Sequence, residues 1–224
     1  MNKALKLVRL DFITVKPYLG LKSLLIFVGV ALIILITDYS AAAAIGLLMV
    51  FAALYVSYPF SVGEKNNIDV LYTILSIKRK TVVLGRYLFS LILDLCAGLF
   101  AFIVSFVALT VMQKSFDALE SFFVTVILFL IFGVIQAVQL PIYFKLGYAK
   151  AKLLAYLPFF VLPLMTLIFP NIFMNVFSAE LTTTLVDWLA ANLLVTILSA
   201  GMIWFAIMAI SYKISLSFYR KRDF

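Results

Sequence analysis

The chain has 224 residues, of which 66% are hydrophobic and only 12% are charged, whereas about a quarter of an ordinary soluble domain is charged. One soluble core cannot bury that much apolar surface, so the composition excludes a soluble globular protein and indicates that lipid is the solvent. The net charge of +8 lies in short loops and near the termini, which favours a membrane-topology signal and no nucleic-acid partner.

The first predicted element is a helix within residues 1–20 that lies in the membrane interface. At about 100° per residue, Leu5, Val8 and Phe12 fall on one face, and Arg9 lies at the edge of that face. A helix of this kind buries its apolar face among acyl chains while its basic residues meet lipid headgroups. Two interpretations stay open: a topology anchor, or an elbow helix that transmits movement from a cytoplasmic partner to the first span. A cleaved signal peptide is not expected, because the basic segment before the apolar run is too long.

Six apolar segments then approach the roughly 20 residues that a membrane-spanning helix needs. They are residues 22–37, 41–60, 84–112, 121–144, 153–170 and 188–212. The sequence therefore predicts an all-α integral membrane protein, with residues 1–224 forming a single transmembrane domain of six helices.

The basic residues give the expected orientation. All of the 18 Lys and Arg residues except Lys114 fall on one side of the six-span arrangement. By the positive-inside rule this side is the cytoplasm, so we expect both termini to be cytoplasmic.

The longest predicted cytoplasmic loop covers residues 61–83 and includes a short helix. Asn66 or Asn67 is suited to the N-cap of this helix. Its apolar residues recur at i, i+3, i+4 and i+7: Ile68, Leu71, Tyr72 and Leu75. The helix could rest on lipid headgroups, or its apolar face could dock into a groove on a soluble partner. Periodicity does not separate these two interpretations.

Three polar residues within the spans are candidates for function. Asp94 is the only acid at membrane depth, and we expect it to pair with a basic residue of another span, to be protonated, or to contact a substrate. Gln136 and Gln139 share a face of the fourth span, which favours hydrogen bonds between helices. An intramembrane enzyme is not expected, because paired aspartates are absent, histidine is absent, and Cys96 has no partner for a metal or redox site.

Two cytoplasmic segments carry a resemblance to a family. The first is Glu64 with the stretch Leu-Ser-Ile-Lys-Arg-Lys-Thr-Val-Val-Leu-Gly-Arg-Tyr-Leu at 75–88, and the second is Leu-Pro-Ile-Tyr-Phe-Lys-Leu-Gly-Tyr-Ala-Lys-Ala-Lys at 140–152. Together they resemble a subgroup of bacterial type-2 ATP-binding-cassette (ABC) exporter permeases. In the first segment Ser76 stands where that subgroup usually has proline. The resemblance implies a multi-pass protein of the bacterial cytoplasmic membrane with the type-2 exporter permease fold.

The resemblance also implies partners and roles. A separate cytoplasmic ABC ATPase subunit would bind ATP and Mg, and this chain, which has no GxxxxGK[ST] phosphate loop, would bind no cofactor and catalyse no reaction. The 61–83 loop, with Glu64, would be the coupling segment for that ATPase. Residues 171–187 would form an external segment that re-enters the bilayer.

The expected assembly and substrate follow from size and polarity. One copy of 25.1 kDa is small for enclosing a pathway, so we expect a second permease copy, as a homodimer or related heterodimer, surrounded by membrane lipids. An amphipathic or hydrophobic substrate is expected, and a bacteriocin or cytolytic peptide is favoured, because the spans hold no charged binding cluster. The alternative is a small non-ABC transporter, channel or scaffold protein.

Overall fold

The computed structural model describes residues 3–18, 20–37, 40–161 and 192–222. Every regular element within these ranges is a helix: α1 (Lys3–Val15), α2 (Leu21–Thr37), α3 (Ala41–Tyr55), α4 (Tyr58–Lys65), α5 (Ile68–Ile74), α6 (Arg79–Val111), α7 (Ala118–Leu146) and α10 (Leu193–Arg220), together with the helical residues 148–161. The predicted external segment 171–187 and parts of the fifth and sixth predicted spans lie outside the described residues.

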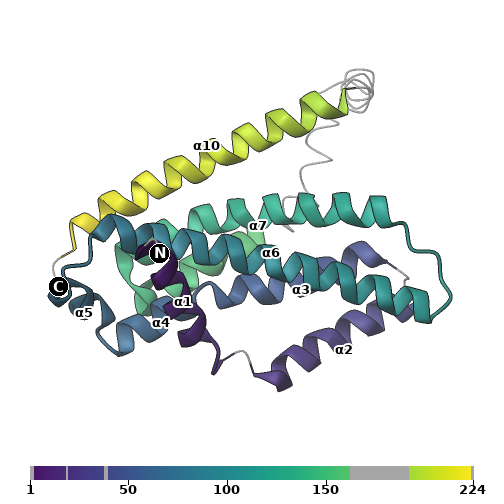
Figure 1. The fold of residues 1–224 in the computed structure, drawn as a ribbon, viewed down its shortest axis with the longest axis horizontal. Coiled ribbons are helices and arrows are strands. Elements are labelled where there is room, and N and C mark those ends of the chain that lie inside the picture. The colour runs from purple at the N-terminus through teal and green to yellow at the C-terminus, as the bar shows by residue number, and fades with distance from the viewer. Residues whose placement is uncertain (1–2, 19, 38–39, 162–191, 223–224) are drawn as a thin grey trace.

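The long helices form a bundle in which α10 packs on α7, α7 on α6, and α6 on both α3 and α1 (Figure 1). One end of the bundle holds α1, α4, α5 and the C-terminal part of α10, and we call it the α5 end. The opposite end holds the end of α2, the start of α3 and the connection between α6 and α7, which contains Lys114 (Figure 1). Apart from Lys22 at the start of α2, the other described basic residues belong to α1 and the residue after it, to α4 and the start of α6, to the end of α7 and the segment after it, or to the C-terminal part of α10 and the residues after it, all toward the α5 end (Figure 1).

Four of the described helices are long and apolar enough to cross a membrane: Ala41–Lys65, Arg79–Val111, Ala118–Leu146 and Val195–Arg220. At 1.5 Å per residue, the 33-residue α6 is about 50 Å long, so it extends well beyond a hydrocarbon core of about 30 Å. The predicted first span corresponds to α2, a shorter apolar helix of 17 residues. The described part of the chain is thus an all-helical membrane bundle.

Side chains at the helix ends explain where several helices begin. The Ser40 hydroxyl accepts a hydrogen bond from the Ala43 N–H at 3.2 Å, which caps α3. Asp117 accepts from the Glu120 N–H at 2.9 Å and caps α7. Pro59 lies in the first turn of α4, where a missing N–H leaves no helical hydrogen bond unmade. Helix α4 begins only three residues after the end of α3. The segment 61–83 therefore holds more helix than the single short helix that the sequence predicts.

The N-terminal helix α1 packs against α6 more deeply than expected for an interfacial helix. Val8 is buried and the Phe12 ring meets the Phe89 ring edge-on at 4.9 Å, but Leu5 is 48% exposed and Arg9 is exposed. The predicted apolar face of α1 is therefore divided between the core and the surface. The buried side of the helix also includes Asp11, because α1 faces a basic residue of α6 there.

Candidate functional site

The short helix α5 presents an apolar patch at the surface of the α5 end. The patch consists of Val70, Leu71, Ile74 and Leu75, and all four side chains are exposed, from 41% at Val70 to 73% at Ile74. Tyr72 points the other way and is buried in the core, and Ile68 packs against the same core. Of the predicted apolar face, Leu71 and Leu75 thus point outward while Ile68 and Tyr72 hold the helix to the bundle.

Both ends of α5 are shaped by residues in the left-handed region. Asn67 occupies the N-cap position with φ +50°, and its side chain makes no capping hydrogen bond. Ser76 has φ +50° after the helix, with hydrogen bonds from the Ser76 N–H to the Thr73 carbonyl and from the Ile77 N–H to the Tyr72 carbonyl. A proline could not adopt that φ, so Ser76 permits a turn that proline at this position would exclude.

Asp69 in the first turn of α5 connects this helix to the end of α10. The Tyr219 hydroxyl donates to Asp69 Oδ1 at 2.8 Å, and Arg222 Nη1 lies 4.0 Å from Asp69 Oδ2. Arg79, at the start of α6, donates to the carbonyls of Tyr219 and Arg220 in the last turn of α10. The Arg79 cation is favoured there because the C-terminus of a helix carries a partial negative charge. The end of α10 is thus held by Arg79 of α6 and by Asp69 of α5.

Glu64 at the end of α4 caps the helical segment 148–161. Its Oε2 accepts hydrogen bonds from the backbone N–H groups of Tyr148 at 2.5 Å and Ala149 at 3.3 Å. A carboxylate is well placed there because the N-terminus of a helix carries unpaired N–H groups and a partial positive charge. Gly147 precedes this helix with φ +76°, a conformation that favours glycine.

A buried ion pair joins α1 to α6 beneath α4. Arg86 Nη1 lies 2.8 Å from Asp11 Oδ1, both side chains are almost fully buried, and the guanidinium lies 4.9 Å from the centre of the Phe60 ring. Burial raises the pKa of Asp11, and the Arg86 charge opposes that rise. Because desolvation is the largest effect, we interpret the pair as fixing the position of α1 more than adding stability.

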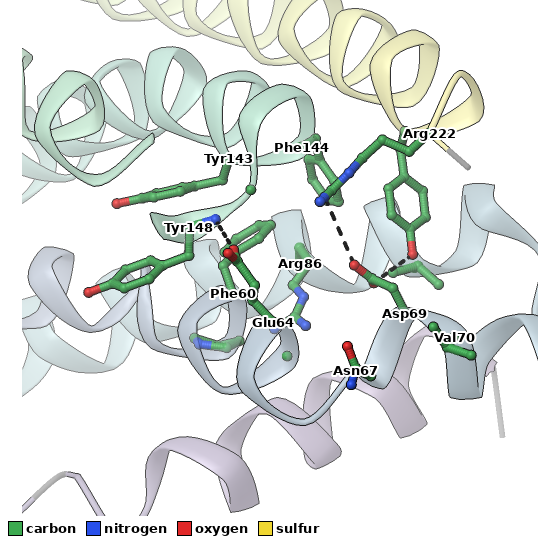
Figure 2. Close-up of a pocket in the computed structure, with 15 residues that line it drawn as sticks. Phe60, Glu64, Asn67, Asp69, Val70, Arg86, Tyr143, Phe144, Tyr148 and Arg222 are labelled. Atoms are coloured by element: carbon green, nitrogen blue, oxygen red, sulfur yellow. Dashed lines mark hydrogen bonds and ion pairs between the residues drawn. The ribbon is translucent and has the colours of Figure 1, made fainter. Parts of the chain in front are cut away.

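One cavity of about 110 Å³ at the α5 end is lined by Glu64, Asp69 and Arg86 together with residues that contact them. In Figure 2, Glu64 points toward the backbone of Tyr148 and Asp69 points toward Arg222, while Arg86 lines the same cavity. Tyr72 packs nearby, and its burial raises the pKa of its hydroxyl. The helices α4 and α5 are therefore linked by polar contacts to segment 148–161 and α10, and by buried contacts to α1 and α6.

Deeper in the bundle, polar residues bond between the long helices. Gln136 Nε2 donates to Asp94 Oδ2 at 2.6 Å, and Gln139 Nε2 donates to the Ala155 carbonyl at 2.8 Å. The partner of Asp94 is thus an amide of α7 and not the basic residue that was one of the expectations. The Tyr87 hydroxyl lies 2.5 Å from Ser211 Oγ, and Ser211 donates to the Ala137 carbonyl at 2.6 Å, which ties α6, α10 and α7 together.

Sequence reasoning missed Asp11, Arg79, Tyr219 and Arg222. Asp11 is the only acid before residue 38, and its recurrence at helical spacing with Val8 and Val15 could have marked it as buried. Tyr219 and Arg222 give no such signal, because their partner Asp69 in α5 is about 150 positions away in the sequence. Among the described residues, no group of three or more His, Cys, Asp or Glu side chains could hold a metal ion.

A family model described as "ABC-2 family transporter protein" matches residues 6–220, nearly the whole chain. Searches of curated proteins and of solved structures found no match.

Proposed function

The chain belongs to the ABC-2 family of transporter proteins, which makes it a multi-pass permease component of an ABC transporter that associates with an ABC ATPase, and we propose that it is an exporter permease driven through α5. The ATPase subunit would supply ATP hydrolysis, with ATP and Mg bound there. The α5 patch would receive the ATPase, and the helices joined to α5 would carry its movement into the bundle.

We place the α5 end in the cytoplasm, with six spans in total and both termini on that side. The support is the distribution of charge: the described basic residues other than Lys22 and Lys114 lie on segments toward the α5 end, and the positive-inside rule assigns such an end to the cytoplasm. A bacterial cytoplasmic membrane is the expected location. A cytoplasmic α5 would meet a soluble ATPase without crossing lipid.

The observation that carries the proposal is the exposed patch on α5. Leu71 and Leu75 are 49% and 60% exposed on a helix of seven residues whose other side is held by the core. A short amphipathic helix with an apolar outer face fits a hydrophobic groove on a partner. Lipid headgroups alone would not require the polar contacts that Glu64 and Asp69 make with other elements on either side of this helix.

Those contacts offer a route for coupling. If the ATPase moves α5, Asp69 would pull the end of α10 through its hydrogen bond with Tyr219. Helix α4, which contacts α5, would move Glu64 and with it the start of segment 148–161. The buried side of α5 would move within the core that it shares with α1 and α6. A displacement at one helix would thus reach elements from both halves of the sequence. Packed helices respond to such shifts as units because their interfaces are close-packed.

We propose that the exported substrate is amphipathic or hydrophobic, with a peptide favoured, and that a second permease copy completes the pathway. On the spans of the described part of the chain, the buried charged side chains are those of Arg86 and Asp94. Arg86 is paired with Asp11. Such an interior would not hold a strongly charged solute. The second copy could be identical or related.

The test is a charge substitution on the patch. The double variant Leu71→Asp/Leu75→Asp, reconstituted with the ABC ATPase that copurifies with the wild-type permease, should lose at least about tenfold in ATPase binding, because burying even one unpaired carboxylate costs more than 1.4 kcal/mol. The variant should still insert in membranes, since both side chains are exposed.

Two variants act as controls. Leu71→Met/Leu75→Met keeps an apolar patch and should bind the ATPase as wild type does. Thr73→Asp adds a charge to α5 outside the patch and should have little effect. Wild-type ATPase binding by the Leu71→Asp/Leu75→Asp variant would contradict the docking assignment.

A further inference from the structure

Asp94 has half of its carboxyl group unused at the centre of the bundle. It lies near the middle of the 33-residue α6, about 22 Å from the start of the helix and about 26 Å from its end at 1.5 Å per residue. Its side chain is nearly inaccessible, since the residue is 1% exposed, and Oδ2 accepts the hydrogen bond from Gln136. Within the described residues, Oδ1 of Asp94 and Oε1 of Gln136 have no hydrogen-bond partner. One buried oxygen on each of these two side chains thus has no hydrogen-bond partner there.

No basic side chain of the described segments neutralises this site. The ion pairs found there are Arg86 with Asp11 and Arg222 with Asp69, and neither involves Asp94. An acid at membrane depth is costly to keep, and such residues usually mark a binding site or an ion path. The cost would be offset when a positively charged donor reaches Oδ1.

Asp94 is one of the residues that line a groove between α6 and α7. The groove has a volume of about 210 Å³, and beside Asp94 its lining includes Leu95, Leu99 and Phe102 of α6 with Phe122 and Phe129 of α7. Leu95, Leu99 and Phe122 are each more than half exposed, so the groove opens on the outer surface of the bundle. The exposed residues at its mouth are apolar, which suits a surface that meets acyl chains.

Depth and polarity together define the occupant. Asp94 is 1% exposed and lies more than about 20 Å along α6 from either helix end, so we expect neither bulk water nor a lipid headgroup to supply a donor there. A donor must arrive on a carrier that enters the apolar groove. We propose that the groove binds a hydrophobic molecule bearing a primary ammonium group, whose N–H donates to Asp94 Oδ1 while its apolar part lies against the Leu and Phe walls.

This assignment rests on the proposed exporter function and names its substrate class: hydrophobic amines, including an apolar peptide that offers a single amino group. It does not depend on the ATPase. Binding can therefore be measured on the permease alone, so that its failure is separable from a failure of coupling at α5.

The first experiment uses wild-type permease in nanodiscs of phosphatidylcholine, a lipid without N–H donors, with radiolabelled dodecylamine as the probe. We expect saturable binding that unlabelled dodecylamine displaces. Dodecyltrimethylammonium, which has the charge but no N–H, should displace the probe at least about tenfold less effectively. Non-saturable binding, or equal displacement by the two cations, would overturn the proposal.

The second experiment uses variants in the same assay. Asp94→Asn keeps the size of the side chain and an acceptor for Gln136, and should weaken dodecylamine binding at least about tenfold, as expected when a charged hydrogen-bond partner is lost. Val126→Trp, which fills the groove, should abolish binding, while Ile127→Trp, an exposed neighbour outside the groove, should not change it. Wild-type affinity in Asp94→Asn or in Val126→Trp would overturn the assignment.

A second copy of the chain is the competing occupant. If Val126→Trp dissociates permease copies by light scattering while Ile127→Trp does not, the groove is a contact between copies and the amine assignment is wrong. If wild-type permease binds the ATPase but not dodecylamine, only this inference fails. If dodecylamine binds but the patch variants of α5 still engage the ATPase, the coupling proposal fails instead.

Discussion

The buried ion pair between Asp11 and Arg86 gives the sharpest prediction about stability. Replacing Asp11 by Leu leaves the Arg86 guanidinium buried without its counter-charge. Replacing Arg86 by Met likewise leaves the Asp11 carboxylate buried without its counter-charge. Both side chains are about 5% exposed and lie 2.8 Å apart, so water does not screen the remaining charge.

The expected magnitudes follow from that burial. Each single substitution should lower the free energy of unfolding by about 3–5 kcal/mol, the usual cost of an uncompensated buried charge. The double variant Asp11→Leu/Arg86→Met should be within about 1 kcal/mol of wild type or more stable, because it removes the desolvation cost of both groups. This non-additivity distinguishes a buried pair from two independent packing contacts.

The assay is the unfolding of the purified permease by SDS in mixed micelles, followed by circular dichroism for all four members of the cycle. The matched control is the cycle of Asp69→Asn and Arg222→Gln, whose side chains are about a third exposed and 4.0 Å apart, so their coupling should stay below about 1 kcal/mol. If Arg86→Met costs less than about 1 kcal/mol, or if the two single costs add in the double variant, the reasoning is refuted.

Two further predictions concern glycines. Gly147→Ala should destabilise the protein by about 1–2 kcal/mol, because φ is +76° and the new Cβ would lie 2.9 Å from Glu64 Oε2. The control is Gly46→Ala, whose Cβ would meet only Leu128 at an ordinary contact distance of 3.9 Å, and it should be neutral or slightly stabilising in the same SDS titration. Gly133→Ala should cost about 1–3 kcal/mol, because its Cβ would lie 2.5 Å from Trp204 Nε1, and adding Trp204→Leu should recover part of that loss; a Gly133→Ala variant as stable as wild type would show that α7 and α10 pack less closely.

The long helices could be predicted from the sequence because hydropathy and helix-capping signals act locally along the chain. Long apolar runs predict α6 and α7 whatever their neighbours are, and an N-cap followed by an apolar period predicts α5. The resemblance to type-2 ABC permeases, based on two short cytoplasmic segments, is confirmed at the level of the family.

The direction in which side chains point could not be predicted in the same way. The period of α5 groups Ile68, Leu71, Tyr72 and Leu75 on one broad face, but the bundle buries Tyr72 and leaves Leu71 open. A period identifies an apolar face without saying which part of it meets the core. In membrane proteins this ambiguity is greater, since lipid and protein interior are both apolar.

Polar partners were the least predictable part of the candidate site. Asp94 was recognised as unusual from its depth, yet its partner, Gln136, was assigned no special relation to it. Asp11 and Arg86 are 75 positions apart, and only the packing of α1 on α6 brings them together. Such pairs depend on tertiary contacts that a single sequence does not encode in any local pattern.

The central claim is that α5 is the point of contact with the ATPase, and site-directed photo-crosslinking tests it most directly. A benzoylphenylalanine placed at Leu75 on the α5 patch is compared with one at Val111, a more exposed position at the opposite end of the bundle. We predict a crosslink to the ABC ATPase subunit from position 75 and none from position 111. No ATPase crosslink from position 75, in membranes where the permease and the ATPase copurify, would contradict the account.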